Sequence, residues 1–247
     1  MPMCTLSRSL ALSGLFIKEQ LKEPVALFWM IISPVVTYYL LAYSRGGGSA
    51  SEVGYMESTS WFYAYISSSV AFFGFSFYIV GRRESGYIRS FVYTPDAKMV
   101  FMAAQFLAYS LVALIYSITF YALTYFSYGS FDVSDLWGVI SRFYICYILF
   151  VIPGVLLGFL PLSFQNTSTV FSIASFIMLV LGILSIGDSY PVFDAVNEFN
   201  PLSVANQIMV GGYEKYSVLI FWIIGSFVAV FLLSLRFLRI NPVWSRY

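Results

Sequence analysis

Long apolar runs alternate with short polar connections along almost the whole chain. Six of these runs are long, and they cover residues 25–43, 61–80, 99–126, 143–161, 170–187 and 218–237. A helix needs about 20 apolar residues to cross the roughly 30 Å hydrocarbon core of a bilayer. Strands of a membrane barrel would instead show alternating segments of about ten residues. The pattern therefore predicts an all-α integral membrane protein, with six transmembrane helices in a single domain over residues 1–247.

A shorter segment with helical periodicity, residues 8–23, precedes the first run. Its Lys and Glu residues gather on one side. The opposite face carries Leu10, Gly14, Ile17 and Leu21. This pattern predicts a helix in the plane of the membrane interface, and Pro24 suits the first turn of the helix that follows. Alternatively, the segment is only a basic flank that sets the topology.

Composition supports the membrane prediction and argues against a soluble domain, a nucleic-acid-binding protein and a disulfide-rich or metal-binding protein. Hydrophobic residues make up 60% of the chain and charged residues 10%, whereas a soluble domain has about 25% charged residues. The net charge of +1 gives no reason to expect a nucleic-acid partner. Cys4 and Cys146 lie far apart and there is no His, so neither a disulfide framework nor a thiolate or imidazole metal site is expected.

The distribution of Lys and Arg predicts the orientation in the membrane, because cytoplasmic connections are enriched in these residues. With six spans and a cytoplasmic N-terminus, the cytoplasmic side holds Arg8, Lys18, Lys22, Arg82, Arg83, Arg89, Lys98, Arg236, Arg239 and Arg246. The other side holds Arg45, Arg142 and Lys215. We therefore expect a multi-pass protein of the plasma membrane with both termini in the cytoplasm.

The apolar runs lack the side chains that energy conversion or catalysis would need. None holds an Asp, Glu, Lys or His in its interior, and Arg142 lies at the edge of a run. Proton-driven carriers usually need such buried ionisable groups. The chain also lacks the GxxxxGK[ST] loop that cradles nucleotide phosphates. We expect no enzyme activity, no catalytic residues and no cofactor or metal on this chain, so energy for uphill movement would come from a partner.

An unusually polar segment, GRRESGYIRSFVYTP at residues 81–95, separates the second and third runs. Charges cluster in it, while Ile88, Phe91 and Val92 share a helical face. We expect a short helix that ends at Pro95 and contacts a soluble partner. A basic loop that only sets the topology would also explain the arginines.

The connection between the fifth and sixth runs, residues 188–216, is long but has its own periodicity. Val192, Phe193, Val196 and Phe199 recur at helical spacing. Asn200 is a good N-cap, Pro201 a good first helical residue, and Gly211–Gly212 a good stop. The segment is therefore expected to form two short helices.

These polar segments resemble the permeases of ABC type-2 exporters. The pattern E-x-G followed by T-P, at Glu84, Gly86, Thr94 and Pro95, resembles the intracellular connection after the second span of that family. The segment KEQLKEPVALFWMIISPVV resembles its opening, with a charged interfacial helix before an aromatic-rich first span. Asn-Pro in the last external connection is a third similarity. The ordered set covers nearly the whole chain.

The resemblance implies a half-transporter that works with a second permease copy or a sister permease. Two cytoplasmic ATPase subunits would bind ATP and Mg²⁺, and residues 81–95 would be the coupling helix that docks on them. The implied ATPase-coupling contacts are Arg82, Arg83, Glu84, Gly86, Arg89 and Phe91. The external helices would be re-entrant and form a gate with Phe193, Phe199, Asn200 and Pro201. From the residues alone, a pair of helices lying on the membrane surface is equally compatible.

The resemblance also places the second and fifth spans beside a central pathway. Its candidate lining residues are Ser68, Ser69, Phe72, Ser76, Ser172 and Ser175. Small hydroxyl residues serve helix packing at least as often. Candidate cargoes are an amphipathic or lantibiotic-like peptide, a drug-like apolar compound and a lipid-linked glycan. The alternative function is a membrane scaffold or sensor subunit that transports nothing.

Overall fold

The computed structural model describes residues 2–23, 25, 28–44, 54–92, 94–127, 133–184 and 195–238, and these contain helices and turns but no strand. In chain order the helices are α1 (Pro2–Leu21), the π-helical η1 (Phe28–Ile32), α3 (Ser33–Ser44), α4 (Tyr55–Ser69), the π-helical η2 (Val70–Ser76), α5 (Phe77–Glu84), α6 (Tyr87–Phe91), α7 (Pro95–Thr124), the short η3 (Tyr125–Ser127), α8 (Val133–Gly158), α9 (Phe164–Leu184) and α11 (Pro201–Phe237).

Five helical units among the described residues are long and apolar enough to cross a membrane: Tyr55–Glu84, Pro95–Thr124, Val133–Gly158, Phe164–Leu184 and Pro201–Phe237. The chain is therefore an integral membrane protein. The first predicted span, residues 25–43, corresponds to a shorter apolar helix, Phe28–Ser44. The expected count of six long spans is thus reduced to five plus this shorter helix.

Several helices extend beyond the apolar runs that predicted them. The second unit begins at Tyr55 and continues through Glu84, so it includes part of the charged segment. Helix α8 begins at Val133 and holds Arg142 well inside it, although the sequence pattern placed Arg142 at an edge. Hydropathy finds the apolar centre of a helix, whereas backbone hydrogen bonds continue into the polar flanks.

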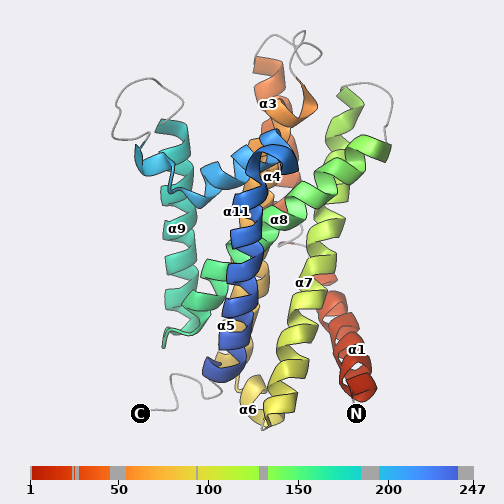
Figure 1. The fold of residues 1–247 in the computed structure, drawn as a ribbon, viewed down its shortest axis with the longest axis vertical. Coiled ribbons are helices and arrows are strands. Elements are labelled where there is room, and N and C mark those ends of the chain that lie inside the picture. The colour runs from red at the N-terminus through yellow and green to blue at the C-terminus, as the bar shows by residue number, and fades with distance from the viewer. Residues whose placement is uncertain are drawn as a thin grey trace.

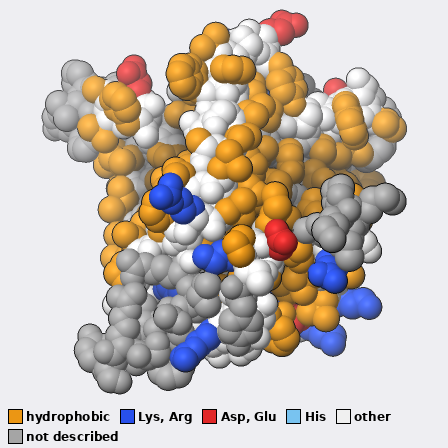
Figure 2. Space-filling view, turned by 60° about the horizontal axis from the view of Figure 1, so that its bottom comes forward, with side chains coloured by type: hydrophobic (Ala, Val, Ile, Leu, Met, Phe, Trp, Pro, Cys, Tyr) orange, Lys and Arg blue, Asp and Glu red, His pale blue; other side chains and the backbone are white. Residues whose placement is uncertain are grey.

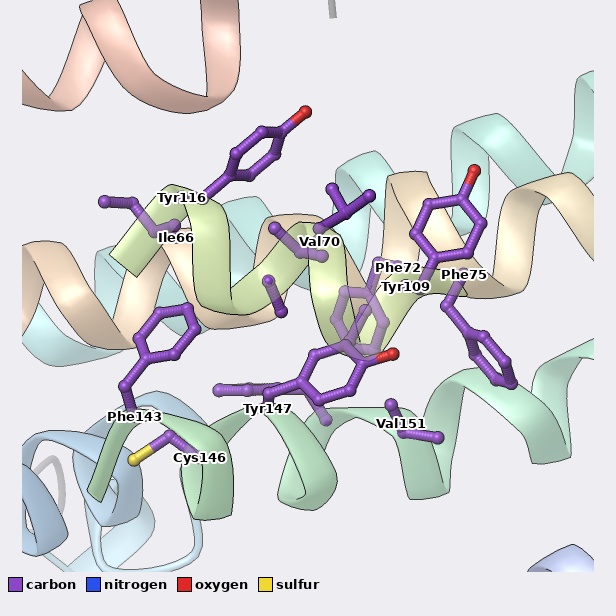
Figure 3. Close-up of a cluster of buried hydrophobic side chains, with 14 of the residues drawn as sticks. Ile66, Val70, Phe72, Phe75, Tyr109, Tyr116, Phe143, Cys146, Tyr147 and Val151 are labelled. Carbon is purple, nitrogen blue, oxygen red and sulfur yellow. The ribbon is translucent and has the colours of Figure 1, made fainter. Parts of the chain in front are cut away.

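The long helices stand side by side, with α6, the start of α1 and the end of α11 at one end and α3 at the other (Figure 1). Helices α4 and η2 run through the centre against α7 and α8. Their shared core is aromatic and aliphatic, and Figure 3 shows part of it around Phe72, Phe75, Tyr109, Phe143 and Tyr147. We call the two ends of the molecule the α6 end and the α3 end.

Helix α1 packs along α7 through a face that the sequence pattern did not identify. Its buried side chains are Ser9, Ser13, Phe16 and Gln20. Phe16 packs edge-on against Phe101, and Tyr109 Oη donates a 2.7 Å hydrogen bond to Gln20 Oε1. The expected apolar face is the outer one, where Leu10 and Leu21 are exposed. The face with small and polar side chains packs against α7, because these side chains allow close approach and a buried hydrogen bond. An interfacial position stays a prediction, and Pro24 lies outside the described residues.

Candidate functional site

The segment between the second and third long units forms a compact joint, which we define as residues 81–95. Helix α5 ends at Glu84, and Gly86 adopts a left-handed conformation with φ 78°, so the chain turns before α6 begins at Tyr87. A side chain at Gly86 would strain this conformation. Thr94 then caps α7 by accepting a hydrogen bond from the amide of Ala97, with Pro95 at the first helical position.

This geometry corrects one expectation for the joint. Pro95 begins α7 and does not end the short helix, which stops at Phe91. The short helix itself is confirmed, although it covers only Tyr87–Phe91. Proline has no amide hydrogen to donate, and that group would have no intrahelical partner in the first turn of a helix.

Arg83 is buried by its own chain and grips the connection between α8 and α9. Only 2% of its side chain is exposed. Its Nη1 donates to the carbonyls of Gly158 (3.0 Å) and Leu160 (3.1 Å), its Nη2 donates to the carbonyl of Leu162, and its Nε donates to Glu84 Oε1 (2.9 Å). The guanidinium thus satisfies carbonyls at the C-terminal end of a helix, where a cation is favoured. Arg83 and Glu84 stabilise the joint from within.

Arg82 makes the opposite connection, toward α1. It forms an ion pair with Glu19, and its guanidinium lies 3.7 Å from the centre of the Phe16 ring and 5.1 Å from that of Tyr87. Cation–π contacts of this kind hold a planar guanidinium between two aromatic faces. The two neighbouring arginines therefore tie the end of α5 to α1 on one side and to the α8–α9 connection on the other.

Helix α6 supplies the exposed charge and the exposed aromatic ring of the joint. Ile88 and Val92 are buried, whereas Arg89 is exposed and Phe91 is 65% exposed. Of the three residues expected to form an apolar face, Ile88 and Val92 are therefore used for packing within the bundle, and Phe91 is left for contact with a partner. Of the six coupling residues expected from the sequence, Arg89 and Phe91 are exposed, and contact with a partner stays a prediction for all six.

A groove of about 560 Å³ runs beside this surface, between α1, α6 and the start of α7. Its walls carry one cation, Arg8, one anion, Asp96, and aromatic rings that include Tyr87, Phe91 and Phe101. Figure 2 turns the α6 end forward and shows several Lys and Arg side chains over this side with few acidic ones between them, while other acidic side chains appear at the upper edge. The α6 end is thus a basic surface with an apolar groove.

The second candidate site lies toward the α3 end, at the start of α11. Asn200 caps this helix by accepting a hydrogen bond from the Leu202 amide, and Pro201 occupies the first helical position, as expected. Asn200 Nδ2 also donates to the Met178 carbonyl of α9 (2.8 Å) and to Asn197 Oδ1 (2.9 Å). Asn200 is buried, so it joins α9 to α11, while Phe199 is 86% exposed. Phe193 lies outside the described residues.

The expected stop at Gly211–Gly212 is confirmed as a kink inside α11. Gly212 has φ 67° and Tyr216 is also non-helical, so α11 consists of two helices joined at this point. We call residues 201–211 the half-helix. Before Asn200, only a single helical turn is described, at residues 195–197. The prediction of two short helices is therefore confirmed for the half-helix alone.

Arg142 holds the end of the half-helix, a role that the sequence did not reveal. Its Nη1 donates to the Met209 carbonyl at 2.8 Å and lies 3.5 Å from that of Val210. One turn further along α8, the Cys146 thiol donates to the Ala205 carbonyl at 3.4 Å. A Cβ atom at Gly212 would come within 2.8 Å of the Arg142 guanidinium. The sequence signal that could have revealed this role is the positive charge of Arg142, because cations are favoured at the C-terminal end of a helix.

Of the six expected pathway residues, the four on α4 and η2 are packed into the bundle, and the two on α9 are not buried. Ser68, Ser69 and Ser76 are buried, and Phe72 stacks on Phe171 of α9 with ring centres 5.2 Å apart. Ser76 borders a cavity of about 10 Å³ near Gly154, which is room for about one water molecule. On α9, Ser172 is exposed and Ser175 half-buried. A role in transport stays a prediction for all six.

Comparison with known proteins gives one relative over nearly the full length. The chain is 29% identical to Protein McbE of Escherichia coli over 240 residues, which cover 96% of this chain and 98% of that protein. No family model matches the chain. Within the described residues, no group of three or more His, Cys, Asp or Glu side chains could hold a metal ion.

Proposed function

We propose that this chain is the transmembrane permease subunit of an ATP-driven exporter of the ABC type-2 class. It moves its substrate outward and draws energy from a separate ATPase subunit. The similarity to Protein McbE, which covers nearly all of both chains, and the five long apolar helices support a membrane subunit. The ordered motifs in the sequence support the ABC type-2 class.

The main support for this proposal comes from the contacts that fix α6 and the turn before it to the rest of the bundle. Its outer side offers Arg89 and Phe91, and its inner side is fixed by Ile88 and Val92. Arg82 and Arg83 anchor the preceding turn to α1 and to the α8–α9 connection. A force applied to the exposed side of α6 would therefore reach both α1 and the α8–α9 connection. A loop that only sets the topology needs no such anchoring.

In this proposal the α6 end faces the cytoplasm and the α3 end faces outward. The start of α1, the end of α11 and α6 lie together at one end, as Figure 1 shows, and the sequence assigns most Lys and Arg residues to this side. The half-helix, with Asn200 and Phe199, then belongs to an external gate. A second permease copy completes the pathway, as the family resemblance implies, and the expected lining residue Ser172 is exposed on α9, where such a copy could pack.

Among the candidate cargoes, an amphipathic peptide fits the exposed faces best. Helices α9 and α11 present wide apolar surfaces interrupted by hydroxyl groups, such as Ser172 on α9 and Ser226 on α11. An amphipathic molecule would find both apolar contacts and hydrogen-bond partners there. A drug-like compound or a lipid-linked glycan would use the same surfaces.

The proposal is tested by purifying the tagged chain in mild detergent from membranes of the cell that produces it. We expect an ABC ATPase to co-purify, and the complex to hydrolyse ATP in nanodiscs while the isolated chain does not. Arg89→Glu should abolish co-purification, because it reverses the one exposed charge of α6. Lys22→Glu is the matched control, since it reverses an exposed charge outside α6. A well-folded chain that binds no ATPase would favour the scaffold or sensor function.

A further inference from the structure

Near each end, α8 takes part in hydrogen bonds between an arginine and backbone carbonyls, and we call each of these sets of contacts a grip. The two grips connect the joint to the half-helix. At the α6 end, the carbonyl of Gly158, the last residue of α8, accepts a hydrogen bond from Arg83. Toward the other end, Arg142 and Cys146 bind the carbonyls of Met209 and Ala205. Sixteen residues separate Arg142 from Gly158, which is about 24 Å along a helix. A single helix thus bridges most of a bilayer core of about 30 Å.

The contacts of the half-helix favour movement together with α8. Arg142 and Cys146 are four residues apart on α8, and their acceptors Met209 and Ala205 are four residues apart on α11. The same side of each helix is therefore joined at two successive turns. On the other side of the kink, Gly212 can absorb rotation because its left-handed φ of 67° already interrupts the helix.

Pro153 is the weak point of α8, and neighbouring side chains brace it. Proline inside a helix removes one backbone hydrogen bond and favours bending. Phe150, just before it, packs edge-on against Phe72 at 5.8 Å. Gly154, just after it, lies so close to Ser76 that a Cβ atom there would collide with the serine side chain. Because η2 supports α8 on both sides of the proline, α8 can transmit a displacement along its length.

We propose that α8 is a lever that passes movement of the joint, received through Arg83, to the half-helix through Arg142 and Cys146. This inference deepens the proposed export function, since the half-helix is a gate only if the chain is an exporter. In that setting, ATP-driven movement of α6 pulls on Arg83, shifts the end of α8, and displaces the half-helix on the far side of the membrane. Arg83 and Arg142 are then positioning residues and bind no cargo.

The test uses the buried side chain of Met209 as a reporter. Met209→Cys is introduced with Cys4→Ser, and the buried Cys146 is kept. The protein is placed in nanodiscs, where both faces are accessible, and the rate of maleimide labelling is measured. A protein without the Met209→Cys change gives the background from Cys146. The assay needs neither cargo nor ATPase, so its outcome is separate from that of the export proposal.

We expect Arg83→Gln to raise the labelling rate of the reporter about tenfold, the factor that one lost charge-assisted hydrogen bond would give if transmitted. Arg142→Gln should raise it at least as much, because that change removes the grip itself. The matched control Arg89→Gln, on the exposed side of α6, should leave the rate unchanged. An unchanged rate in Arg83→Gln, together with a raised rate in Arg142→Gln, overturns the lever. An unchanged rate in both shows that the grip does not hold the half-helix.

Two further measurements decide the question if Arg83→Gln loses its folded gel-filtration peak. Arg83→Lys keeps the charge but cannot reach three carbonyls with one ammonium group, so it should raise the labelling rate by a smaller factor. Hydrogen exchange of the unaltered protein gives an independent answer. Residues 158–162 and 205–211 should exchange with the same opening rate if α8 links them, and clearly different rates would exclude the link.

Discussion

The central unit Tyr55–Glu84 and the helix α11 use their apolar side chains in opposite ways. The central unit is the least hydrophobic of the five membrane-crossing units, yet 72% of its apolar segment is buried in the bundle. Helix α11 is the most hydrophobic, and only 22% of its segment is buried. Its surface exposes Phe221, Trp222 and Leu232. In a soluble protein the order would be reversed, because water drives the most apolar helix inward.

The difference shows that hydropathy finds membrane helices without finding the core. Lipid tails are as apolar as leucine, so burial in the bundle gains little hydrophobic free energy. Close packing and hydrogen bonds decide which helices lie inside. The central unit supplies Ser67, Ser68 and Gly74 for close approach, and aromatic rings such as Phe72 and Phe75 for contact area. Helix α9, which is also only 22% buried, resembles α11 in this respect.

The largest expected effect comes from Arg83 at the end of the central unit. Arg83→Ala would remove a buried charge that donates hydrogen bonds to three carbonyls and to the Glu84 carboxylate, and it should lower the free energy of unfolding by about 3–5 kcal/mol. Thermal unfolding in detergent measures it. Arg236→Ala is the counterpart on α11, where the side chain is exposed, and its melting temperature should match that of the unaltered protein. If both variants lost the same amount of stability, the central unit would not be held more firmly by its polar contacts than α11.

A smaller effect is expected from adding one methyl group to each unit. A Cβ atom at Gly74 would lie 2.7 Å from the ring of the buried Tyr109, whereas Gly225 on α11 has no such neighbour within 4 Å. Gly74→Ala should therefore cost about 1–3 kcal/mol through overpacking. Gly225→Ala should be neutral or slightly stabilising, because alanine favours the helix. The same thermal assay compares them, and a stable Gly74→Ala variant would contradict the packed core.

The smallest expected effect on stability concerns the contact between the two peripheral helices, α9 and α11. Asn200 caps α11 and donates to Met178 of α9, so Asn200→Ala should cost about 1 kcal/mol. The matched control is Asn166→Ala, which removes an exposed side chain from α9. Hydrogen exchange near residues 200–204 should increase in the first variant alone. A similar increase in both would mean that the Asn200 contacts do not hold the pair together.

Local chemistry was readable from the sequence wherever backbone rules alone decide the structure. The cap at Asn200, the proline after it and the break at Gly212 were all expected and are found. The same holds for a short helix near Ile88 and for the long apolar helices. These features follow from the reach of one side chain or from the need of a bilayer for internally bonded backbone. No contact between distant residues is required.

From the sequence alone, the chain is predicted to be a helical membrane protein with a charged joint and a capped half-helix. The contact partners of its charged side chains follow only from the fold. Arg83, expected at a partner surface, is buried against the α8–α9 connection, and Arg142, counted only as a topology signal, holds the half-helix. Both bind backbone carbonyls, which every residue possesses. No residue pattern marks such an acceptor, so these contacts exist only once the fold brings a helix end to the arginine.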